Sequence, residues 1–171
     1  MSKPFIVLGM HRSATSLVAG GLHKFGVDMG RRQLGRTKSN RKGHFEDKDF
    51  LELNIEILNA NGGTWRNPPD TINPHLLGRA AQELVEAKMD TGNELWGWKD
   101  PRTALTYPIY EPHLGPDAHL VCVFRRPANV ARSLESRNNI PIPQAAALAD
   151  TYNRAILEAA AKHVGLDITI H

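Results

Sequence analysis

The apolar positions along the chain follow two kinds of pattern. Short continuous apolar runs, such as residues 5–8 and 119–124, are typical of strands buried on both faces of a sheet. Longer segments with apolar residues three and four positions apart are typical of helices that cover one face. Strands are predicted at residues 5–8, 96–99, 119–124 and 166–170, and helices at residues 13–25, 47–61, 73–91, 128–137 and 142–164.

The alternation of strands and helices predicts a single α/β domain over residues 1–171. Parallel pairing is expected because a crossover helix returns the chain to the same end of the sheet. Residues 28–44 show no apolar periodicity and are rich in glycine and in basic residues, so they are predicted to form a loop.

Composition narrows the class of protein. The chain has 171 residues, of which 41% are hydrophobic and 23% charged, as in an ordinary globular domain. A net charge of +3 suits an anionic ligand, but the charge is not gathered into a basic tract, so nucleic acid is not expected as a partner. The one cysteine, Cys122, lies in an apolar run and is expected to be buried. Because a disulfide needs two cysteines, an intrachain disulfide is excluded.

No apolar stretch is long enough to span a membrane. The apolar segment near the N-terminus is also too short for a signal peptide, and a cytoplasmic protein is therefore expected.

A phosphate-binding loop is the first candidate for chemistry. Residues 9–16, GMHRSATS, lie between a predicted strand and a predicted helix and match G-x-x-x-x-G-K-[ST] at Gly9 and Ser16. Ala14 stands in the place of the second glycine and Thr15 in the place of the lysine. The backbone N–H groups and dipole of a helix start suit an anion, and Arg12 can supply the missing cation. The spacing alone also fits an ordinary turn with an exposed arginine.

The second candidate segment starts where the strand at 119–124 ends. Arg125-Arg126-Pro127 is followed by Ser133, eight residues after Arg125. This segment offers no acid to hold Mg²⁺ and, together with the missing lysine, argues against hydrolysis of ATP or GTP. An arginine and a helical serine at this spacing could instead hold a phosphate by charge-assisted hydrogen bonds.

Together the two segments resemble the PAPS-dependent sulfotransferase family, where PAPS is 3′-phosphoadenosine-5′-phosphosulfate. That family has a 5′-phosphosulfate loop of the form [PR]-[KR]-S-G-T-[ST] and a 3′-phosphate motif R-[DN]-P-x(5)-S. The chain is most similar to the bacterial-type branch with a G-M-H-R-S-G-T-S loop. The resemblance implies a three-layer P-loop-like domain, with a central, mainly parallel sheet flanked by helices.

The resemblance also implies the ligand contacts and the reaction. PAPS would be the donor, with PAP as product and no metal, and the acceptor would be a hydroxyl of a small molecule, a carbohydrate or another compound. The residues implied to bind the nucleotide are Arg12, Ser13, Ala14, Thr15, Ser16, Arg125 and Ser133.

Two further segments are similar to those of the family and of its tyrosylprotein relatives. Residues 42–47, KGHFED, are similar to G-[HY]-[FW]-E-D, and residues 98–102, WKDPR, are similar to K-D-P-[RF]. The resemblance implies that Glu46 is the general base and that Lys99, with Arg12, stabilises developing charge. The alternatives are that Glu46 or Asp47 only favours a helix N-terminus, and that Lys99 pairs with Asp100.

Other residues are weaker candidates. His11 is a rival base or a donor contact, while His44 and Arg102 could contact the acceptor. The basic stretch 31–48 is expected either to border an acidic acceptor or to be a solvated loop. The three tryptophans are expected to pack in the core.

The chain departs from the family at three places. Ala14 would be strained where a glycine uses positive φ, Arg126 replaces an acid or amide, and the C-terminal part is short relative to the family. A PAP- or PAPS-binding module without catalysis, or a subunit that needs a partner, is therefore the main alternative, and a P-loop nucleotide kinase is a further one.

Overall fold

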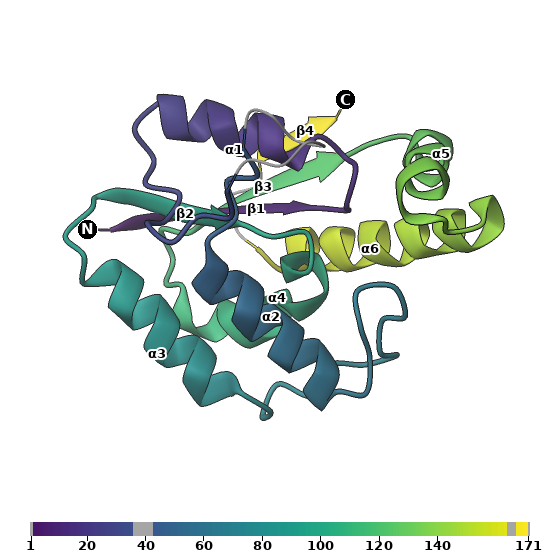
Figure 1. Ribbon diagram of the computed structural model, residues 1–171. Helices are drawn as coiled ribbons and strands as arrows, with labels where there is room; N and C mark the ends of the chain where they lie inside the picture. Colours follow the sequence, from purple (N-terminus) through teal and green to yellow (C-terminus); the bar gives the residue numbers. More distant parts are fainter. Residues whose placement is uncertain (1, 36–42, 164–166, 171) are drawn as a thin grey trace.

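The structure is a computed structural model that describes residues 2–35, 43–163 and 167–170. A sheet of four parallel strands runs through it in the order β2-β1-β3-β4 (Figure 1). The strands are β1 Lys3–Gly9, β2 Leu95–Lys99, β3 His119–Phe124 and β4 Asp167–Ile170. The predicted α/β class, the four strand positions and the parallel pairing are confirmed.

Helices cover both faces of this sheet. Figure 1 shows α1 on one face and α4 and α6 on the other, while α2 and α3 lie outside α4 and pack against it. The helices are α1 Thr15–Lys24, α2 Lys48–Ala60, α3 Gly78–Met89, α4 Thr103–Tyr110, α5 Pro127–Asn138 and α6 Ile142–Lys162, with a short 3₁₀ helix, η1, at Glu111–His113.

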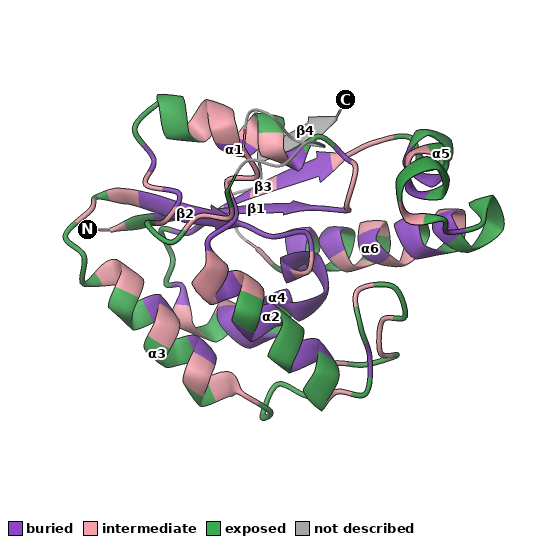
Figure 2. Cartoon of the chain, viewed as in Figure 1, coloured by how far each residue is buried: buried purple, intermediate pink, exposed green. Residues whose placement is uncertain are grey.

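The central strand β1 supplies side chains to two separate cores. Ile6 and Leu8 belong to a large apolar cluster shared with helices of the α4 and α6 face, whereas Val7 packs with Ala19 of α1. Successive side chains of a strand point to opposite faces, so an unbroken apolar run fills both cores. Figure 2 shows β1 buried along most of its length, as the run at residues 5–8 predicts.

Helix α4 is absent from the prediction. Seven of its eight residues are buried, so it has no exposed polar face, and Pro108 lies inside it. Periodicity cannot detect a helix that is buried on all sides. Helix α3 also begins at Gly78 rather than at residue 73, and Leu77 before it has a left-handed φ of 61°.

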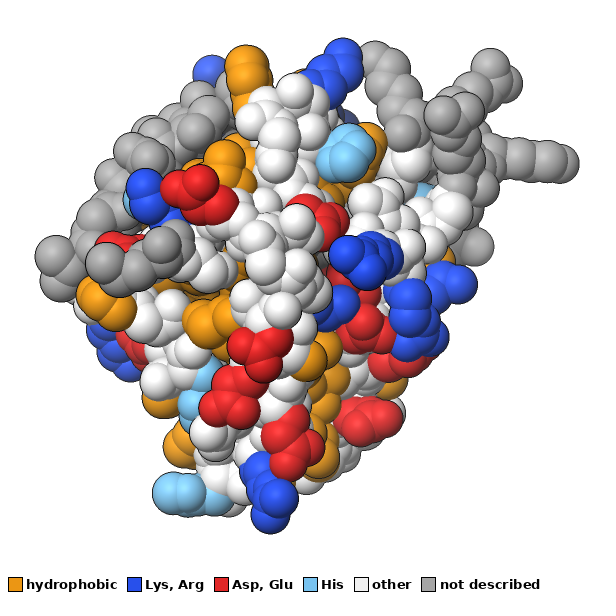
Figure 3. Space-filling model, turned by 90° about the vertical axis from the view of Figure 1, so that its left-hand side faces the viewer, with side chains coloured by type: hydrophobic (Ala, Val, Ile, Leu, Met, Phe, Trp, Pro, Cys, Tyr) orange, Lys and Arg blue, Asp and Glu red, His pale blue; other side chains and the backbone are white. Residues whose placement is uncertain are grey.

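The surface carries charges of both signs. Figure 3 shows acidic and basic side chains interspersed on the face that its view presents. Two ion pairs within single helices, Arg79–Glu83 and Arg154–Asp150, lie at exposed positions. None of the described helices is both long enough and apolar enough to cross a bilayer.

Candidate functional site

The turn between β1 and α1 has a conformation that permits little substitution. A Cβ on Gly9 would lie against the Thr15 side chain and within 3.0 Å of the Val123 carbonyl oxygen. Arg12 and Ala14 both adopt left-handed backbone conformations, with φ of 71° and 66°. Such residues are strained unless they are glycine, and strain of this kind gathers at ligand-binding turns. Position 14 thus has the positive φ at which alanine in place of glycine is strained.

Replacement of Ala14 by glycine is expected to stabilise the chain by about 1 kcal/mol, because it removes the left-handed penalty of a Cβ. Urea denaturation measures the change in the free energy of unfolding. Ala147→Gly, at an exposed position inside α6, is the matched control. It is expected to destabilise by about 1 kcal/mol, because glycine disfavours a helix interior. If both variants changed the free energy of unfolding in the same direction, the left-handed conformation of Ala14 would be contradicted.

The structure brings the two predicted anion-binding segments into direct contact. Arg12 Nε donates to Ser133 Oγ at 2.9 Å, and Arg125 Nη1 donates to the Arg12 carbonyl oxygen at 2.7 Å. The contact arises because β1 and β3 are neighbours in a parallel sheet, so the segments that follow them share one edge. Burial, and then the charges of Arg137 and Arg125, lower the pKa of Arg12. Several cationic groups therefore converge on this edge.

Glu46 and Lys99 form a buried ion pair beside the start of α1. Lys99 Nζ lies 2.5 Å from Glu46 Oε1 and 3.3 Å from Ser16 Oγ. Glu46 is 8% exposed and Lys99 is 1% exposed. Burial lowers the pKa of Lys99, while the negative charge of Glu46 opposes that change. A carboxylate, an ammonium group and a hydroxyl of the loop are thus grouped at one point.

The two neighbouring acids before α2 have different roles. Asp47 is the N-cap of α2, because its side chain accepts the Asp49 N–H at 3.0 Å, and it also pairs with Lys88 at 2.7 Å. Glu46 does not cap the helix. Phe45, which precedes it, has a left-handed φ of 52°, a strained conformation for a bulky residue. The structure therefore assigns the helix-terminus role to Asp47 and leaves Glu46 to the pair with Lys99.

Asp100 forms its ion pair with Arg102, whereas Lys99 forms its own with Glu46. Asp100 Oδ1 accepts the backbone N–H of Arg102 at 3.1 Å and Nη1 of the same residue at 2.8 Å, while Oδ2 accepts Asn54 Nδ2 at 3.1 Å. Burial raises the pKa of Asp100, and the charge of Arg102 opposes that change. The alternative pair Lys99–Asp100 is therefore wrong.

Asn54 is a residue of the site that the sequence analysis does not identify. It is fully buried, donates to Asp100 and to Thr103, and accepts hydrogen bonds from Thr106 and Tyr110. The sequence does contain a pattern that could have identified Asn54, because position 54 lies four residues from each of the apolar positions 50 and 58. A single polar residue on the apolar stripe of a helix marks a buried hydrogen-bond network.

His11 turns toward α6 and the segment after α2. Its ring lies 4.5 Å from the ring of Trp65 and 6.2 Å from that of Tyr152. Burial, followed by the charges of Arg102, Lys99 and Arg12, lowers the pKa of His11 well below its usual value. Burial and these positive charges therefore disfavour the charged form of the imidazole.

Three buried polar side-chain atoms of the described residues have no hydrogen-bond partner. They are His11 Nε2, Ser13 Oγ and Arg102 Nε. Buried polar groups are normally paired, so each such atom calls for an explanation. All three belong to residues of the candidate site.

The remaining predicted contacts are placed only in part. His44 is half-buried in the segment that leads to Glu46. Of the seven basic residues between 31 and 48, Arg36, Lys38, Arg41 and Lys42 lie outside the described residues. Arg32 pairs with Asp49 and Glu52. Trp96 and Trp98 are buried in the core as predicted, and Trp65 is partly buried against it.

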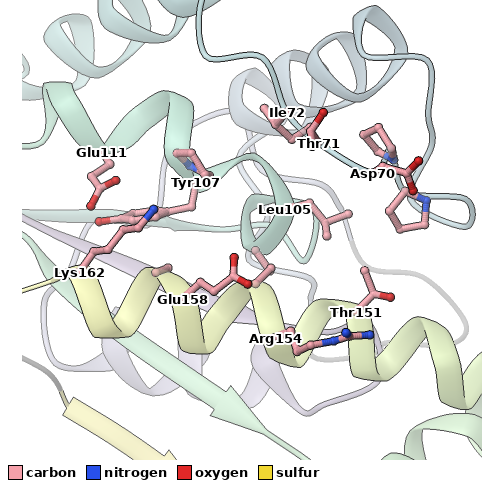
Figure 4. Close-up of a pocket in the computed structure, with 16 residues that line it drawn as sticks. Asp70, Thr71, Ile72, Leu105, Tyr107, Glu111, Thr151, Arg154, Glu158 and Lys162 are labelled. Carbon is pink, nitrogen blue, oxygen red and sulfur yellow. The ribbon is translucent and has the colours of Figure 1, made fainter.

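A cavity of about 590 Å³ lies apart from these residues, between α4, α6 and the segment 68–72. Figure 4 shows carboxylates and basic side chains around it, among them Asp70, Glu111 and Lys162. None of the predicted site residues lines this cavity. The candidate site is therefore the sheet edge around the turn at residues 9–16.

No described group of three or more histidine, cysteine, aspartate or glutamate side chains is arranged to hold a metal ion. Comparison of the chain with protein-family models and with curated protein sequences finds no match. The chain's own motifs and the geometry of the sheet edge are therefore what indicate its function.

Proposed function

We propose that the protein is a sulfotransferase that moves the sulfuryl group of PAPS to a hydroxyl of an acceptor. The contact of Arg12 with Ser133 and Arg125 is the observation that carries the proposal. A nucleotide with an anionic group at each end needs two anion-binding segments at one sheet edge. The proposal includes a three-layer P-loop-like fold, which the helices on both faces of a parallel sheet support.

The residues of the turn fit an oxyanion ligand. The backbone at Gly9 leaves no room for a Cβ, and the buried hydroxyl of Ser13 has no partner within the described residues. Helix α1 begins at Thr15, so its unpaired N–H groups and its dipole face the turn. The main chain and side chains of residues 12–16 would hold the 5′ end of the nucleotide, and Arg125 with Ser133 would hold the 3′-phosphate.

The chemistry is an in-line displacement, in which the acceptor oxygen forms a bond to sulfur as the bond from sulfur to the phosphate oxygen of PAP breaks. Glu46 takes the proton of the acceptor hydroxyl. Lys99 lies between Glu46 and Ser16 and can shift from the carboxylate toward charge that develops beside the loop. Arg12 adds positive charge from the other side of the turn.

The proposal predicts that PAP binds more tightly than AMP by about 10- to 100-fold, since charge-assisted hydrogen bonds to the 3′-phosphate add affinity. A thermal-shift assay measures this difference in affinity, because the stabilisation by a ligand rises with the logarithm of the ratio of ligand concentration to dissociation constant. Arg125→Gln should abolish the preference for PAP and leave AMP binding near normal. Arg126→Gln, at the exposed neighbouring position, should keep the preference.

Equal affinity for PAP and AMP in the wild-type protein would refute the proposed donor. Tight binding of Mg²⁺-ATP with indifference to the 3′-phosphate would favour a nucleotide kinase. Tight PAP binding with no transfer from labelled PAPS to a panel of alcohols, phenols and sugars would instead favour a PAP-binding module.

A further inference from the structure

Arg102 has one edge of its guanidinium group fixed and the other edge unpaired. Its Nη1 donates to Asp100, whose second oxygen is taken by Asn54, so this edge is anchored in a buried network. The side chain is only 14% exposed, and Nε is buried with no hydrogen-bond partner in the described part of the chain. The guanidinium is a rigid fork, and its Nε edge matches two oxygens of a sulfate or carboxylate.

His11 presents a second buried nitrogen without a hydrogen-bond partner among the described residues. Arg102 is the neighbouring charge with the largest effect on the His11 ring, ahead of Lys99 and Arg12. Trp65 and Tyr152 flank the ring, and the Tyr152 hydroxyl is occupied by the Trp65 carbonyl oxygen at 3.1 Å. Neither aromatic side chain forms a hydrogen bond with His11 Nε2. In the tautomer that carries its proton on Nε2, the ring would offer a donor without an acceptor in a positively charged environment.

We propose that Arg102 and His11 form an oxyanion subsite on the α4 side of the loop, separate from the nucleotide phosphate contacts at Arg12, Arg125 and Ser133. The subsite takes one sulfate-sized oxyanion, which is either the sulfuryl group of the donor or an acidic group of the acceptor. This inference rests on the proposed function and names residues that hold the transferred group or select the acceptor.

Calorimetric titration of inorganic sulfate into the PAP-saturated protein tests the subsite. PAP occupies both phosphate positions and lacks the sulfuryl group, so sulfate can report on the remaining site. Arg102→Gln is expected to weaken sulfate binding by about 10-fold or more, because the bidentate contact is lost. His11→Phe, which keeps an aromatic ring against Trp65, is expected to weaken it severalfold. Arg132→Gln, an exposed position beside Ser133, should change little.

Wild-type sulfate affinity in both His11→Phe and Arg102→Gln would overturn the inference. The His11 variant does not touch the Asp100 network, so it keeps the test decisive if Arg102→Gln fails to fold. Normal PAP binding with unchanged sulfate binding would contradict the subsite alone. Absence of PAP binding would contradict the proposed function, and the same titration without PAP would still decide the subsite.

Turnover distinguishes the two sources of the oxyanion. With 3-hydroxybenzoate and 3-hydroxybenzamide as acceptors, a donor contact predicts that His11→Phe raises the KM for PAPS equally with both. An acceptor contact predicts that the variant loses activity toward the benzoate and keeps it toward the benzamide. No change in either measurement would overturn the inference.

Discussion

Replacement of Glu46 by glutamine is expected to lower the rate of sulfuryl transfer by about 10²- to 10⁴-fold, the usual contribution of a general base. The amide keeps the size of the side chain and can still accept a hydrogen bond from Lys99, but it takes no proton from the acceptor. PAP affinity should stay within about twofold, because the proposed role of Glu46 is toward the acceptor and not toward the nucleotide. Single-turnover transfer from labelled PAPS measures the rate, and calorimetry with PAP measures the affinity.

Asp47→Asn is the matched control for this variant. Asparagine caps a helix about as well as aspartate, so α2 should remain intact and transfer should continue. Loss of PAP affinity or of folding in Glu46→Gln would reassign Glu46 to structure. If Asp47→Asn lost transfer while Glu46→Gln stayed active, the general base would be Asp47 and not Glu46.

The strands and the meeting of the two anion-binding segments could be predicted from the sequence because both follow from local rules. A short apolar run bounded by glycine or basic residues is a buried strand. Two such strands paired in parallel place the residues that follow them at one edge. The resemblance implies that Arg125 and the turn after Gly9 hold the two ends of one nucleotide, and the pairing of β1 with β3 places Arg125 in contact with Arg12.

The side-chain pairs within the site could not be predicted in the same way. Lys99 and Asp100 are adjacent in the sequence, which favours a local ion pair. Successive side chains at the end of a strand point to opposite sides, so Lys99 meets Glu46 and Asp100 meets Asn54. These partners are 53 and 46 residues away, and only the packing of α2 beside β2 and α4 brings them close. Pattern rules describe elements, whereas these pairs depend on how elements pack.

Replacement of Asp100 by alanine is expected to destabilise the protein by about 3–5 kcal/mol, the usual cost of leaving one partner of a buried ion pair uncompensated. Arg102 would lose its carboxylate partner, and the Asn54 amide would lose one acceptor. Urea denaturation measures the loss as a lower midpoint.

An isosteric variant separates charge and hydrogen bonding from the cavity that alanine leaves. Asp100→Asn keeps the volume but turns an N–H₂ group toward either Arg102 or Asn54, both of which donate to this side chain, so it should also be strongly destabilising. Glu83→Ala removes the partner of Arg79 on the surface of α3 and should leave the midpoint within experimental error, because exposed pairs contribute little. If Asp100→Asn were as stable as the wild type, the network around Asn54 would not anchor Arg102, and the guanidinium would be held by packing alone.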